Sequence, residues 1–222
     1  MKFLLVLTLI LTSCSQTVST SDTKAPKAAL PKVLIIGDSI SAGYTPYAKK
    51  YLQGKAEVTR IKGNGQYTGT GLKMIDQWLG NTKWDVIHFN WGLWDIYGWR
   101  FQNEDRSPST YEMRLERLVK RLKETNAKLI WATTTPVCPK PEVTMKRKWK
   151  QDVIISKATE KQYLDAALRV MKKHNIEVND LHSLIEPDLK KYAIAPHDVH
   201  YKREGKEKLG KQVADAIEKS LR

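Results

Sequence analysis

The strongest constraint on the fold of this chain is a short apolar run at residues 33–36 (VLII) that ends at Gly37. Consecutive apolar residues without polar alternation are typical of a strand buried on both faces of a sheet. Four further strands are predicted at residues 56–61, 85–90, 128–133 and 176–178.

Helical patterns lie between the predicted strands. Ser109 and Glu112 have the spacing of a capping box at a helix start. Strands that alternate with helices predict βαβ units, a parallel sheet and a three-layer α/β/α sandwich, in which ligands bind beyond the carboxyl ends of the strands. Within the predicted helices, four sets of apolar residues recur at helical spacing and are expected to face the core. These sets are Leu72, Ile75 and Leu79; Leu115, Leu118, Val119 and Leu122; Leu164, Ala167, Leu168 and Met171; and Leu209, Val213, Ile217 and Leu221.

Composition excludes several classes of protein. The chain has 222 residues, of which 41% are hydrophobic, which suits one globular domain. Its two cysteines exclude a disulfide scaffold and a thiolate zinc site. No two histidines have the i, i+4 spacing of helical metal ligands, so neither a metal nor another cofactor is expected. His88 is expected in the core, and His174 and His182 at the surface or at helix ends.

The first 14 residues have the features of an export signal. Lys2 precedes an apolar run at residues 3–11, which is too short to span a bilayer as a stable helix. The run ends in Leu-Thr-Ser-Cys, which resembles a bacterial lipobox and predicts lipidation of Cys14. The alternative is an ordinary secretory signal with a chance cysteine. Either way export is expected, and lipidation would anchor the protein in the membrane of the bacterial cell envelope.

The rest of the chain divides into a tether and one domain. Residues 15–31 are rich in Ser, Thr, Ala, Pro and Lys, which predicts a flexible tether, and residues 32–222 form the folded domain. With Cys14 lipidated, Cys138 has no disulfide partner and is expected to be a buried thiol. Nucleic acid is not an expected partner because no binding motif is present. The oligomeric state is left open.

Two short segments at opposite ends of the domain carry residues for nucleophilic catalysis. Gly37-Asp38-Ser39 follows the first strand, where a tight turn exposes a serine hydroxyl beside a backbone N–H that suits an oxyanion. A serine capping a helix N-terminus is the alternative. Near the C-terminus, His200 is a candidate base for Ser39, and Asp198 is a candidate to orient that base.

Together with Gly92-Leu93-Trp94-Asp95 after the third strand, these segments resemble the SGNH (GDSL-type) hydrolases. The motifs occur in the order of the family, and together they extend over nearly the whole of residues 32–222. The resemblance implies a flavodoxin-like fold of about five parallel strands and an esterase activity. It also implies that Ser39 is the nucleophile and His200 the general base.

The resemblance identifies the residues of the oxyanion hole less completely than it identifies the nucleophile and the base. It implies a glycine N–H donor, for which Gly65 is favoured and Gly63 is the alternative. The family places an asparagine in the hole where this chain has Trp94, and Asn64 or Asn90 are candidates to compensate. The family acid stands three residues before the histidine, at the position of His197, so the assignment of Asp198 departs from the pattern. A Ser39–His200 dyad with a backbone carbonyl is the alternative.

The loop after the third strand is dense in aromatic residues, with Trp91, Trp94, Tyr97 and Trp99 as candidate contacts for a sugar ring. A loop packed by its own aromatic side chains is the alternative. A basic stretch at residues 140–161 is either a lid that attracts anionic glycans or an anionic membrane surface, or simply a solvated basic surface.

The sequence thus predicts an esterase that removes acyl groups, most simply acetyl, from a carbohydrate. The alternatives are a lipase or thioesterase of the same family, and a non-catalytic glycan-binding protein on a degenerate hydrolase scaffold.

Overall fold

The computed structural model describes residues 29–137 and 155–222. Its centre is a fully parallel five-stranded sheet with the order β2-β1-β3-β4-β5. The predicted α/β sandwich with five parallel strands is confirmed. The strands are β1 (Lys32–Ile36), β2 (Glu57–Arg60), β3 (Val86–Phe89), β4 (Lys128–Ala132) and β5 (Glu177–Asn179).

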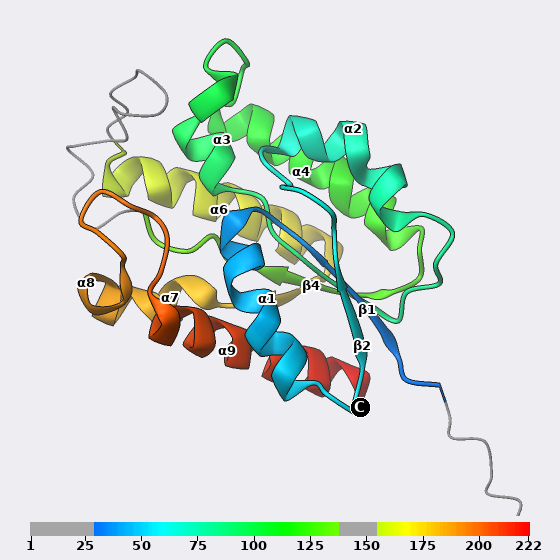
Figure 1. Cartoon of the computed structure of the whole chain (residues 1–222). Helices are drawn as coiled ribbons and strands as arrows, with labels where there is room; N and C mark the ends of the chain where they lie inside the picture. The colour runs from blue at the N-terminus through cyan, green and yellow to red at the C-terminus, as the bar shows by residue number, and fades with distance from the viewer. Residues whose placement is uncertain (1–28, 138–154) are drawn as a thin grey trace, which may run out of the picture.

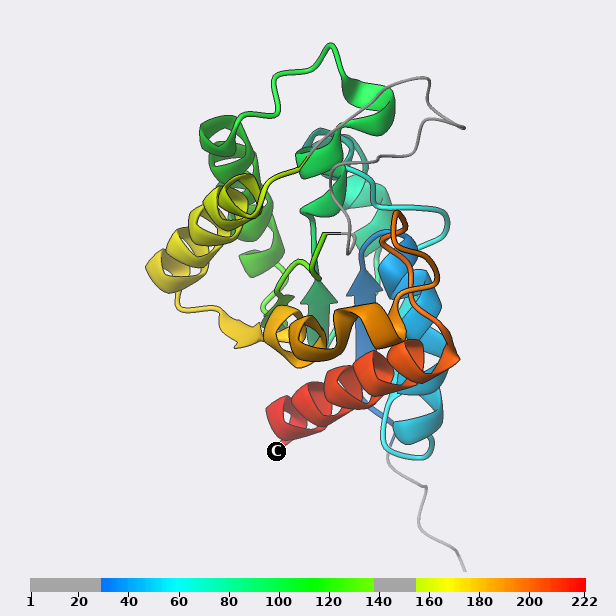
Figure 2. The ribbon, with the colours of Figure 1, turned by 90° about the vertical axis from the view of Figure 1, so that its left-hand side faces the viewer.

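Helices cover both faces of the sheet and complete the three layers (Figure 1, Figure 2). Helices α1 (Ser39–Tyr51) and α9 (Arg203–Leu221) pack against each other on one face, with α7 (Leu181–Ile185) beside α9. Helices α2 (Thr68–Leu79), α4 (Pro108–Lys123) and α6 (Lys157–His174) cover the other face. The short elements are α3 (Leu93–Tyr97), η1 (Trp99–Phe101), η2 (Glu186–Asp188) and α8 (Leu189–Tyr192).

The strand order explains where a site forms. From β1 the chain crosses to the edge strand β2 and then returns to β3 on the other side of β1. Because the strand order reverses between β1 and β3, a crevice is expected at their carboxyl ends, as in other doubly wound folds. Ser39 follows β1 and Asn90 follows β3 at this edge.

Two local predictions were wrong. Helix α4 begins at Pro108 and is capped by Ser107, whose side chain accepts from the Thr110 N–H, so Ser109 and Glu112 do not form a capping box. Proline suits the first helical turn because it has no N–H to leave unpaired. In α6, Leu168 is 38% exposed, because the face turned to the core is set by Tyr163, Ala166, Ala167, Val170 and Met171.

Several predicted features lie outside the described residues. These are the export signal with Cys14, most of the tether, Cys138 and most of the basic stretch. Among the described residues, none of the helices is both long enough and apolar enough to cross a membrane.

Candidate active site

The turn between β1 and α1 presents Ser39 as the first residue of a helix. Asp38 is the N-cap, and its carboxylate accepts from the Ile40 N–H at 2.9 Å. A side chain at Gly37 would bring its Cβ to 2.9 Å from the Cβ of Ser41, so the close packing of the turn requires glycine there. Burial raises the pKa of the Asp38 carboxyl. The turn is closely packed, while Ser39 itself is only partly buried.

The loop before α9 brings His200 to this turn from the opposite end of the chain. An isolated antiparallel bridge joins Ala193 and Tyr201, and the Ile194 N–H donates to the His200 carbonyl at 3.0 Å. The Lys202 N–H closes the loop on the Tyr192 carbonyl at 2.8 Å. These backbone contacts fix His200 on both sides.

Ser39, His200 and Asp198 lie in one hydrogen-bonded row. The Ser39 Oγ is 2.8 Å from His200 Nε2, and His200 Nδ1 is 2.5 Å from Asp198 Oδ1. The same Asp198 oxygen also accepts from the His200 N–H at 2.8 Å. The spacing of two residues therefore suffices for the carboxylate to reach the ring. The side chains of His200 and Asp198 are each 36% exposed, so a substrate can reach them.

The oxyanion hole differs from the predicted one. The Gly65 N–H donates to the Gly37 carbonyl at 3.0 Å, and the Gly65 carbonyl accepts from Trp91 Nε1 at 3.2 Å. These contacts contradict the prediction that Gly65 offers its N–H to an oxyanion. Gly65 instead ties the β1–α1 turn to the segment after β3.

The other predicted donors differ in what they contact. The Asn64 Oδ1 accepts from the Gln66 N–H at 2.8 Å, and Asn90 donates to the Ala132 carbonyl at 2.8 Å. A donor role for either residue stays a prediction. In the described part of the chain, the Ser39 N–H has no acceptor, as expected for the first turn of a helix.

Asp95 follows Trp94 in α3 and makes contacts that could not be predicted from the sequence. It is fully buried, and its carboxylate accepts from the Thr68 N–H at 3.1 Å and from the Thr68 Oγ1 at 2.6 Å. It thereby caps the N-terminus of α2, where an anion is favoured. Burial raises the pKa of Asp95 to about 7, against the opposing effect of the Thr68 hydrogen bonds.

This shift predicts a pH-dependent stability. Because the folded state holds the Asp95 proton more tightly than the unfolded state, this group makes the free energy of unfolding fall as the pH rises from about 4 to 7. Asp95→Asn removes the titration. We expect urea denaturation to show the variant gaining stability relative to the wild type between pH 5 and pH 8. A difference that is constant with pH would contradict this assignment.

The aromatic side chains after β3 do not form an exposed platform. Trp91, Trp94, Tyr97 and Trp99 are between 1% and 9% exposed. Trp99 stacks on Tyr97 with ring centroids 5.0 Å apart and meets Trp94 edge-on at 4.7 Å. The prediction of a sugar platform is contradicted by this burial, and the alternative, a loop packed by its own aromatic side chains, matches the structure.

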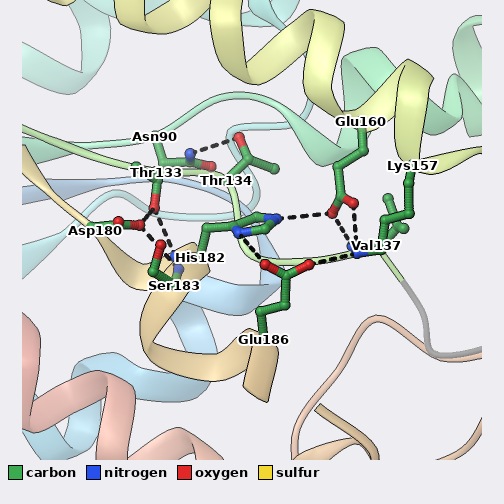
Figure 3. Close-up of polar contacts among 10 residues, drawn as sticks. All are labelled: Asn90, Thr133, Thr134, Val137, Lys157, Glu160, Asp180, His182, Ser183 and Glu186. Carbon is green, nitrogen blue, oxygen red and sulfur yellow. Dashed lines mark hydrogen bonds and ion pairs between the residues drawn. The ribbon is translucent and has the colours of Figure 1, made fainter. Parts of the chain in front are cut away.

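His182 lies at an end of the short helix α7, one of the two predicted positions, but not at the surface. It is buried, with Nε2 at 3.2 Å from Glu160 Oε1 and Nδ1 at 3.4 Å from Glu186 Oε2 (Figure 3). These three residues have ligand-type atoms close enough to hold a metal ion. The Lys157 Nζ, however, lies 2.8 Å from Glu160 Oε2 and 3.0 Å from Glu186 Oε1. Its positive charge already neutralises negative charge of the two carboxylates. Glu160 also accepts from the Val137 N–H at 2.8 Å, so the cluster fixes the segment after β4.

The remaining histidines follow the predictions more closely. His88 is fully buried in β3, and burial lowers its pKa to about 3, so the ring is neutral at pH 7. His174 lies at the end of α6 beside Glu116. His197, at the position of the family acid, is partly buried.

A serine, an imidazole and a carboxylate in this order, beside a helix N-terminus at the switch point of a doubly wound sheet, have the arrangement that serine hydrolases use. The family model for GDSL-like lipases and acylhydrolases matches residues 33–213. The chain belongs to this family. No curated protein sequence matches it.

Solved structures share the fold at low sequence identity. A lipase/acylhydrolase from Enterococcus faecalis superposes with a TM-score of 0.68 at 20% identity, covering 86% of this chain and 96% of the other. The acetyl xylan esterase AlAXEase gives 0.65 at 16%, with coverages of 84% and 99%. Axe2, an acetylxylan esterase from Geobacillus stearothermophilus, gives 0.65 at 19%, with coverages of 84% and 94%.

Proposed function

We propose that this protein is a serine esterase that removes acetyl groups from a carbohydrate through an acyl-enzyme. The observation that carries the proposal is the row of contacts from Ser39 through His200 to Asp198. A non-catalytic glycan-binding protein would have no need to keep these three groups aligned. The row therefore favours catalysis over the binding function.

The geometry supports a two-step reaction. Ser39 Oγ attacks the ester carbonyl as its proton passes to His200 Nε2, while Asp198 accepts from Nδ1 and stabilises the imidazolium. The oxyanion of the tetrahedral intermediate accepts from the Ser39 N–H. His200 then protonates the leaving alkoxide. In the second step His200 takes a proton from water as the water attacks the acyl carbonyl, and then returns it to Ser39 Oγ as the bond from Oγ to the acyl group breaks.

The choice of substrate depends on the structural relatives. Two of them are named as acetyl xylan esterases, which supports a small acyl group on a polysaccharide. The buried aromatic side chains give this choice no support. The E. faecalis relative, a lipase/acylhydrolase, keeps a lipid ester as the second candidate. We further propose that the protein is exported and held at the bacterial membrane by a lipid on Cys14.

A panel of esters tests this proposal. We expect the full chain to hydrolyse p-nitrophenyl acetate with a higher kcat/KM than the octanoate and palmitate esters, and to release acetate from acetylated xylan. A preference for the long-chain esters would favour the lipid substrate. Binding of acetylated xylan without turnover of any ester would favour the non-catalytic protein.

A further inference from the structure

Arg60 connects the edge strand β2 to the turn that carries Ser39. It is the last residue of β2, and β2 is paired with β1, so its side chain starts beside the carboxyl end of β1. All five N–H donors of a guanidinium can be used at once. Here Nε donates to Ser41 Oγ at 2.9 Å, Nη2 to the carbonyls of Asp38 at 2.9 Å and Gly37 at 3.2 Å, and Nη1 to those of Ile61 at 3.0 Å and Gly63 at 2.9 Å.

These acceptors are all neutral oxygens. Among the described residues, no carboxylate forms an ion pair with Arg60. The partly buried guanidinium is bonded mainly to backbone carbonyls, two of them in the β1–α1 turn, while the Asp38 carboxylate acts on its charge without forming an ion pair. A hydrogen bond from a charged donor is roughly twice as strong as one between neutral groups.

The Asp38 carbonyl is the acceptor that links Arg60 to the chemistry. It accepts from Arg60 Nη2, from Ser41 Oγ at 2.7 Å and from the Ala42 N–H at 3.1 Å. This carbonyl belongs to the same peptide group as the Ser39 N–H. Since hydrogen bonds polarise one another along a chain, donors at the oxygen of a peptide make its N–H a stronger donor.

We propose that Arg60 is a positioning residue that strengthens the Ser39 N–H as the donor to the oxyanion. The inference rests on the proposed esterase function. Two other donors expected from the family are changed in this chain: Trp94 replaces the asparagine and packs against Trp99, and the Gly65 N–H is used on Gly37. A stronger Ser39 N–H compensates for them.

The test compares charge-removing and charge-keeping variants of Arg60. With p-nitrophenyl acetate we expect Arg60→Gln to lower kcat about 10–100-fold, less than the loss of a whole oxyanion donor, with KM within about threefold. Arg60→Lys keeps the charge and should recover part of the loss. Ser41→Ala removes a neutral donor to the same carbonyl and should cost less than Arg60→Gln.

Binding of a boronic acid distinguishes this role from a structural one. Its tetrahedral adduct with Ser39 Oγ places an oxygen where the oxyanion forms, so its inhibition constant should rise in Arg60→Gln by the factor by which kcat/KM falls. Titration to completion with a fluorophosphonate counts the intact sites in each variant. Arg169→Gln, which breaks an exposed pair with Glu112 between α6 and α4, is the matched control and should change neither quantity.

The outcomes separate the two proposals. Wild-type kinetics in Arg60→Gln, or a fall in kcat explained by a matching fall in the number of titratable sites, would overturn the role of Arg60 and leave the esterase function standing. A wild-type chain without Ser39-dependent turnover would overturn both. Equal losses in Arg60→Gln and Arg60→Lys, with boronic acid affinity unchanged, would show that Arg60 is a structural tie.

Discussion

Ser39→Ala is expected to reduce ester hydrolysis to the background rate, a loss of about 10³–10⁶-fold in kcat. The reason is that Ser39 Oγ is the group aligned on His200 Nε2, and its removal leaves no nucleophile in the row. The hydroxyl makes no other contact that holds the described fold together. The thermal unfolding midpoint should therefore stay within a few degrees of the wild-type value.

Ser109→Ala provides the matched control for this variant. Ser109 is an exposed serine in the first turn of a helix, as Ser39 is in the first turn of another, but it lies on α4. Its loss should leave turnover unchanged. Turnover retained by Ser39→Ala would exclude Ser39 as the nucleophile and would direct the search to another group near His200.

The fold could be predicted from the sequence because its signals are local. The run at residues 33–36 reports burial on both faces, and those side chains are at most 1% exposed between β2 and β3. Helix boundaries are set by finer effects. At α4, with Pro108 in the first turn, the N-cap is Ser107, two residues before the predicted cap Ser109, while the core-facing residues from Leu115 to Leu122 are as predicted.

The site was predictable only in part, because side-chain direction depends on contacts distant in the sequence. Aromatic density after β3 does not show whether the rings face solvent, and Trp91 is buried beside Phe89 and Trp78, with its indole N–H donated to the Gly65 carbonyl. His182 carries no sequence signal for its contact with Glu160, 22 residues away. The Gly65 N–H likewise donates to the Gly37 carbonyl only because the fold places the β1–α1 turn beside it. Arg60 could not be found because four of its five acceptors are backbone carbonyls, which carry no sequence signal.

The second large effect is expected from Asp198→Asn. The carboxylate accepts from His200 Nδ1, which fixes the tautomer that leaves Nε2 free to take the Ser39 proton. An asparagine amide can turn its NH₂ toward Nδ1 and stabilise the opposite tautomer. We expect kcat for p-nitrophenyl acetate to fall about 10²–10⁴-fold, with a smaller change in KM.

The competing dyad model makes a different prediction for the same variant. If a backbone carbonyl oriented His200, loss of the Asp198 charge would cost less than about tenfold, well short of the effect of a misplaced tautomer. Asp215→Asn, which removes an exposed carboxylate paired with Lys211 on α9, controls for the change in net charge and should leave kcat unchanged. A small effect in Asp198→Asn would contradict a catalytic triad.

Asp198→Ala should be less stable than Asp198→Asn. Asp198 Oδ1 also accepts from the His200 N–H, and the alanine variant loses this loop contact as well. The two variants thus separate the electrostatic role of the carboxylate from its role in shaping the loop.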